Sequence, residues 1–75
     1  MKKLKTKYKP GNYVEYVRHI FPIKEIEIGK IINLWGNFDE LHGYLIKNIE
    51  GTQVIITKEN IIRKVSKKEV LALII

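Results

Sequence analysis

Few side chains in this 75-residue sequence could carry out covalent or metal chemistry. The chain has two histidines, one aspartate, one serine and no cysteine. His19 and His42 stand 23 residues apart, a spacing that matches no metal-ligand motif even with Asp39 or Glu40 nearby. Ser66 has no adjacent base to activate it as a nucleophile, and capping a helix explains it better. We therefore expect no enzyme activity, no metal site and no cofactor.

The positive charge is concentrated in the first ten residues. The net charge is +6, and residues 1–10 hold five lysines and no acid, so the rest of the chain is nearly neutral. In KLKTKYK (3–9) a lysine occupies every odd position: Lys3, Lys5, Lys7 and Lys9. As a flexible tail, this segment would either bind nucleic acid or an acidic protein surface in a salt-dependent way or stay in solvent without a function. As a strand, it would place its lysines on one face and Leu4 and Tyr8 on the other, where they would cover an edge of the fold.

Alternating apolar residues and turn signals predict a β-rich chain. Pro22 predicts a loop over 18–25, and Gly29 predicts a bulge that shifts the apolar phase inside the second strand. Glu50-Gly51 predicts a hairpin turn, and KEN (58–60) is long enough for only one tight turn. The expected strands are 12–17, 25–35, 43–49, 52–57 and 61–65.

The C-terminal stretch SKKEVLALII (66–75) favours a short helix. Ser66 followed by Glu69 forms a capping box, and Val70, Leu73 and Ile74 would share one helical face. A sixth strand is the alternative, because LALII is also typical of a buried strand. Either element must pack inward or be covered by a partner subunit.

The order of these elements resembles the SH3-like small β-barrel. KPGNYVEYV (9–17) is similar to the opening of many SH3-like and KOW-type domains, GKIINL (29–34) to the start of their second strand, and ITKENIIRKV (56–65) to their closing strands. The resemblance implies an all-β fold of about five strands. It also implies neighbouring loops that form an aromatic recess, flanked by Arg18, Lys24 and Lys30. The recess would be lined by Ile20, Phe21, Pro22, Ile23, Trp35 and Phe38. The alternative is that these loop residues enlarge the core, with Phe21 and Ile23 leaning inward and Trp35 and Phe38 outward.

Members of this superfold bind proline-rich peptides, nucleic acid or ribosomal proteins. We do not expect proline-rich ligands, since the first loop is not acidic and the chain has one tryptophan. We expect a binding module associated with nucleic acid. The expected contacts to nucleic acid or an acidic partner are Lys3, Lys5, Lys7, Lys9, Arg18, Lys24, Trp35 and Phe38.

The alternative is a protein-interaction module, in which Phe21, Trp35 or the tail Leu71 to Ile75 docks on a partner. The Lys-, Ile- and Asn-rich composition suits an accessory protein of an AT-rich bacterial or phage genome. We expect a Lys-rich segment over 1–9, a barrel over 10–65 and a helix or strand over 66–75. We also expect a monomer or a weak homodimer. We expect no membrane contact and a cytoplasmic location, because the sequence shows no cysteine, no signal peptide and no apolar run of membrane-spanning length.

Overall fold

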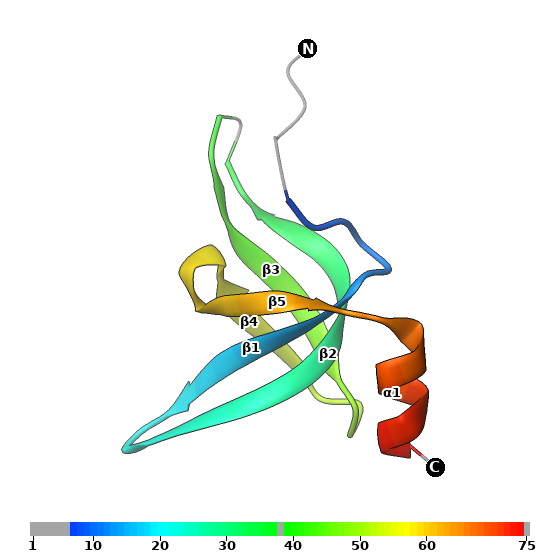
Figure 1. Ribbon diagram of the computed structural model, residues 1–75. Helices are drawn as coiled ribbons and strands as arrows, with labels where there is room; N and C mark the ends of the chain where they lie inside the picture. The colour runs from blue at the N-terminus through cyan, green and yellow to red at the C-terminus, as the bar shows by residue number, and fades with distance from the viewer. Residues whose placement is uncertain (1–6, 38, 75) are drawn as a thin grey trace.

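The computed structural model describes residues 7–37 and 39–74, and most of it is β-strand (Figure 1). A single-turn 3₁₀ helix, η1, joins two of the strands and spans Lys58–Asn60. The other elements are β1 (Tyr13–Ile20), β2 (Ile23–Gly36), β3 (Leu41–Asn48), β4 (Gln53–Thr57), β5 (Ile61–Val65) and α1 (Lys67–Ile74). The all-β class, the five strands and the C-terminal helix are therefore confirmed.

The five strands form one antiparallel sheet in the order β4-β3-β2-β1-β5. The sheet is not closed, since β4 and β5 lie at its two edges and do not pair with each other. Its concave face carries the core, and alternate residues of each strand supply the core side chains. The largest fully buried ones are Tyr16, Tyr44, Ile31, Ile46 and Val14.

The first connection differs most from the sequence prediction. The expected loop over 18–25 is wrong, because β1 continues to Ile20 and β2 already begins at Ile23. Only Phe21 and Pro22 lie between the strands, and the peptide bond joining them is cis. Pro22 sits in the turn, where its missing N–H costs no ladder hydrogen bond. The result is a long two-stranded hairpin that projects from the sheet (Figure 1).

The expected bulge at Gly29 is also wrong. The β1–β2 pairing runs without a shift through Val14↔Gly29, and the two irregularities of the β2–β3 pairing lie between Ile31 and Asn33 and between Trp35 and Gly36. A Cβ atom on Gly29 would lie 2.5 Å from Cγ2 of Ile46 and 2.8 Å from the carbonyl oxygen of Lys47. Gly29 therefore permits the close approach of β2 and β3.

The helix α1 is fixed to the sheet by its first turn. The Ser66 hydroxyl accepts a hydrogen bond from the backbone N–H of Glu69 at 3.2 Å, as the capping box predicts. The Glu69 carboxylate receives two hydrogen bonds from Arg63 of β5, at 2.9 and 3.4 Å. Val70 is buried, whereas Leu71 and Leu73 are more than half exposed. The helix thus covers one part of the sheet and leaves apolar side chains in solvent.

Candidate nucleic-acid interface

The chain just before β1 is tied to the end of the sheet by a buried tyrosine. Tyr8 is 8% exposed and packs edge-to-face on Tyr44, with ring centroids 6.0 Å apart. The backbone N–H of Gly11 donates to the carbonyl oxygen of Ile31, and Ile31 donates in turn to Asn12. Residues 7–9 form a bend instead of a strand, so the regular strand alternative does not hold there. Lys3 and Lys5 lie outside the described residues.

The two described lysines of this segment both face solvent. Lys7 Nζ lies 5.8 Å from the centroid of the Tyr8 ring, a cation–π contact. The backbone N–H of Lys9 donates to the side chain of Asn12 at 3.0 Å, which fixes the bend without engaging the Lys9 ammonium group. Within the part of the chain that the structure describes, neither ammonium group has an ion-pair partner. Both charges are therefore available to an anionic ligand.

Trp35 lies at the same end of the sheet. It directly follows Leu34, which pairs across the strands with Tyr44, the residue that holds Tyr8. Trp35 is 43% exposed, and its ring lies 5.5 Å from that of His42 at an angle of 54°. The histidine supports one side of the indole, and the exposed part offers an apolar surface to solvent. Because successive strand residues point to opposite faces, Trp35 lies on the other face of the sheet from Leu34 and Tyr44. Phe38, the other predicted aromatic contact, lies outside the described residues.

Arg18 and Lys24 belong to a different region, the projecting hairpin. Lys24 and Trp35 stand eleven residues apart on β2, about 36 Å for a straight strand. The expected recess between the first loop and Trp35 is therefore wrong. Phe21 is 97% and Ile23 58% exposed, so neither leans inward as expected.

The charge of Arg18 is already compensated. Its guanidinium group donates to Glu27 at 3.3 Å, and the Tyr16 hydroxyl donates to the same carboxylate at 2.9 Å. Burial, followed by the hydrogen bond to Glu27, raises the pKa of Tyr16 far above its usual value. This arrangement holds the base of the hairpin together and leaves Arg18 little capacity for a ligand. Lys24 is exposed and is not ion-paired within the described part of the chain.

Sequence reasoning placed Lys30 beside the expected recess but missed its cross-strand partner, Lys47. The two lysines lie directly opposite each other on β2 and β3, and both are exposed. Neither has an acidic partner among residues 7–37 and 39–74. Like charges in such a pair destabilise a sheet, whereas a bound anion would relieve the repulsion. The register of the two strands was needed to find this pair, because 17 residues separate them in the sequence.

In the described ranges, no three histidine or acidic side chains gather closely enough to hold a metal ion. None of the helices described there has the length and apolar character needed to cross a membrane. Comparison of the chain with protein-family models, curated proteins and solved structures finds no match.

Proposed function

We propose that the protein is a non-enzymatic module that binds nucleic acid with its Lys-rich segment (residues 1–9) and Trp35. The observation that carries this proposal is the anchoring of Tyr8 on Tyr44, which fixes the segment's end at the part of the sheet where β2 carries the half-exposed Trp35. The lysines would supply sequence-independent attraction to phosphates, and the indole would stack on a base. The proposal extends to an SH3-like architecture, supported by the strand order and by the single turn η1 between β4 and β5.

Single-stranded nucleic acid is the preferred form of this ligand. Stacking on Trp35 requires an unpaired base, and a strand can follow the lysines from there. Reading base edges in a duplex groove depends largely on arginine forks, and the chain has two arginines. One of them, Arg18, is held by Glu27 and the other, Arg63, by Glu15 and Glu69. Binding is therefore expected to show little sequence preference.

Trp35 allows a direct test because it is the chain's only tryptophan. Titration with an oligothymidylate should quench its fluorescence, since a stacked base replaces water on the indole. Because the variants have no tryptophan, their affinity is measured by fluorescence anisotropy of a dye-labelled oligothymidylate. In that assay Trp35→Ala should weaken binding by about 1–3 kcal/mol, the usual contribution of one stacked base. Trp35→Phe is the control, because it keeps an aromatic surface and should retain most of the affinity. Unchanged affinity in Trp35→Ala would remove the indole from the binding surface.

A second candidate function is protein interaction through the hairpin tip. Ile20, Phe21 and Ile23 are 40%, 97% and 58% exposed, and such grouped apolar side chains are typical of docking surfaces. The tip lies at the other end of β2 from Trp35, so both functions can coexist. Cross-linking from a photoreactive phenylalanine analogue at position 21 in cells would identify a bound protein. Recovery of uncross-linked chain alone would count against this function.

A further inference from the structure

The hairpin leaves one backbone edge of β2 unpaired. Residues Ile23–Ile28 pair with β1 on one side, whereas β3 joins β2 only from Gly29 onward, where Asn48 is its partner. Within the described residues, no strand occupies the edge that β3 leaves open. An unpaired edge offers a row of backbone donors and acceptors to another extended chain.

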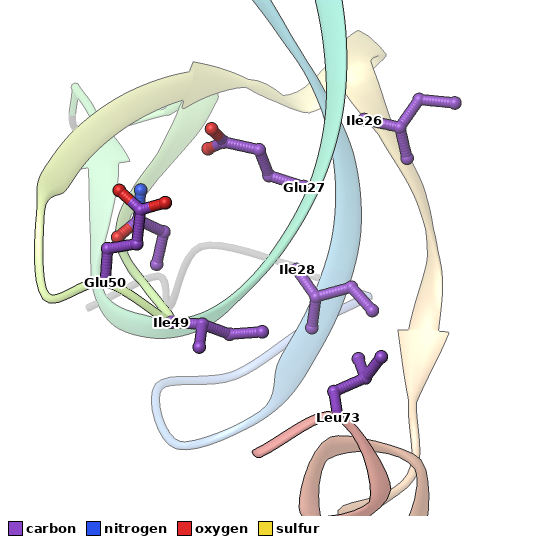
Figure 2. A pocket seen from close by; sticks show the side chains of 7 residues that line it. Ile26, Glu27, Ile28, Ile49, Glu50 and Leu73 are labelled. Atoms are coloured by element: carbon purple, nitrogen blue, oxygen red, sulfur yellow. The ribbon is translucent and has the colours of Figure 1, made fainter. Parts of the chain in front are cut away.

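This edge borders a pocket of about 290 Å³. Figure 2 shows Ile26, Ile28 and Leu73 on one side of the β2 ribbon, and the carboxylates of Glu27 and Glu50 on the other. The cross-strand pairs Tyr16↔Glu27 and Arg18↔Glu25 place Glu25 on the same face of the hairpin as Glu27. An added strand would therefore meet carboxylates on one face and isoleucines on the other.

Residues 3–6 have the complementary pattern. Lys3 and Lys5 alternate with Leu4 and Thr6, just as Glu25 and Glu27 alternate with Ile26 and Ile28. Laid along the open edge, such a strand would place both lysines on the carboxylate face and Leu4 beside Ile26, Ile28 and Leu73. We propose that the open edge of β2 binds the Lys-rich segment of a second copy of this chain as an added strand.

The segment of the same copy is anchored toward the other end of β2. Tyr8 packs on Tyr44, and Tyr44 is the cross-strand partner of Leu34. Leu34 lies six residues after Ile28 on β2. That separation is about 20 Å along a straight strand, whereas the four residues from Tyr8 to Leu4 span at most about 14 Å. This anchoring at the far end of β2 therefore favours the segment of another molecule at the open edge.

Two copies of the open edge do not suit each other. A two-fold axis that joins the edges of two antiparallel hairpins keeps each face continuous, so glutamates at positions 25 and 27 would face glutamates. Glu25 and Glu50 have no ion-pair partner in the described part of the chain, and only Glu27 is paired with Arg18. The charge on this edge therefore favours a lysine-rich strand over a copy of itself.

Sedimentation velocity of the full-length chain at low salt, without nucleic acid, tests the proposal. The wild type should associate as its concentration rises from micromolar to millimolar. The segment variant is Lys3→Glu with Lys5→Glu, and the edge variant is Glu25→Lys with Glu50→Lys. Each variant should associate at least about tenfold more weakly than the wild type, because the segment and the edge then carry charges of the same sign. Each of the four substitutions reverses a charge. Glu27 is left intact because its carboxylate accepts hydrogen bonds from Tyr16 and Arg18.

A mixture of the two variants separates the proposal from a general charge effect. The acidic segment of the segment variant is complementary in charge to the basic edge of the edge variant. The basic segment of the edge variant is likewise complementary to the acidic edge of the segment variant, so the mixture should regain association. Lys67→Glu with Lys68→Glu is the control with the same charge change as the segment variant, and it should associate like the wild type. A wild type that stays monomeric, variants that associate normally, or a mixture without rescue would each overturn the proposal. None of these outcomes depends on nucleic-acid binding, so the two proposals fail separately.

Discussion

At the scale of single residues, Tyr16 shows how a polar group joins the core to the projecting hairpin. Its ring is fully buried, and its hydroxyl donates to Glu27 at 2.9 Å. Glu27 also accepts from Arg18, so this one carboxylate receives two donors at the base of the hairpin. Removal of the hydroxyl would leave a partly buried carboxylate with one donor fewer.

Tyr16→Phe is expected to lower the free energy of unfolding by about 1.5–3 kcal/mol at neutral pH, because a hydrogen bond to a charged group is lost. Burial raises the pKa of Tyr16 above its unfolded value, so its contribution is complete below pH ~10. Above that pH, the unfolded state loses a proton that the folded state retains, and stability falls. Urea unfolding from pH 8 to 12 should show this fall in the wild type and a shallower one in Tyr16→Phe. Equal slopes would contradict this role of Tyr16.

Single residues also show what the sequence could reveal about the site. Tyr8 covers part of the fold, as one interpretation of KLKTKYK expected, although it does so from a bend and not from a strand. Trp35 is 43% exposed, which agrees with the surface position expected for it. Phe21 was misplaced because an apolar residue in a small protein usually packs inward, and nothing local reveals that a turn holds it in solvent. Lys47 was missed because its partner Lys30 is defined only by strand register.

At the scale of elements, α1 depends on a small group of polar contacts at its N-terminus. Arg63 of β5 bonds to Glu69 of α1, and its Nε lies 3.3 Å from Glu15 of β1. Hydrogen bonding from Arg63 is the main cause that lowers the pKa of Glu69. One guanidinium group thus connects two strands to the helix.

Acidification is therefore expected to loosen α1 before the sheet. Because the folded pKa of Glu69 is lowered, its contribution is present above the usual glutamate pKa of 4.5 and is lost as pH falls through the folded value. Amide hydrogen exchange of α1 between pH 3 and 6, corrected for intrinsic rates, would measure this change. Glu69→Gln should make the protection of α1 nearly independent of pH in that range. Protection that still falls equally in Glu69→Gln would assign the effect to another group.

The hairpin tip is expected to contribute almost nothing to folding. Phe21→Ser should change the free energy of unfolding by less than about 0.5 kcal/mol, because the side chain is 97% exposed and loses no contacts. Val14→Ser on the same strand pair is the contrasting control, since Val14 is fully buried. Chemical denaturation compares the two, and a large loss in Phe21→Ser would mean that the tip packs against the sheet in solution.

The elements themselves were largely predictable, whereas their lengths were not. Alternation and the S-x-x-E signal located all five strands and the helix, because these are local patterns. The loop over 18–25 was wrong because a proline in a two-residue turn has the same sequence signature as one in a longer loop. The open edge of β2 depends on where β3 ends, a long-range fact that no local pattern contains.

At the scale of the whole molecule, the Lys-rich segment has two proposed partners, nucleic acid and the edge of a second copy. Both use the same lysines, so they compete. An oligothymidylate should therefore dissociate the self-associated protein in sedimentation velocity, with half-dissociation near the concentration that gives half-maximal Trp35 quenching. Association that persists at saturating oligothymidylate would show that the two surfaces are separate.

The most direct test of nucleic-acid binding is the salt dependence of affinity for an oligothymidylate. The plot of log K against log salt concentration should be compared for three proteins. These are the wild type, a segment variant in which glutamine replaces Lys2, Lys3, Lys5 and Lys9, and a control variant in which glutamine replaces Lys58, Lys64, Lys67 and Lys68. Each variant loses four charges, and Tyr8 and its contact with Lys7 stay intact in both.

The segment variant should reduce the magnitude of the slope by about 3, since each phosphate contact on a single strand contributes about 0.7. The control should change the slope by less than about 1, because its lysines lie outside the proposed interface. Equal slopes in the two variants would contradict binding through the Lys-rich segment.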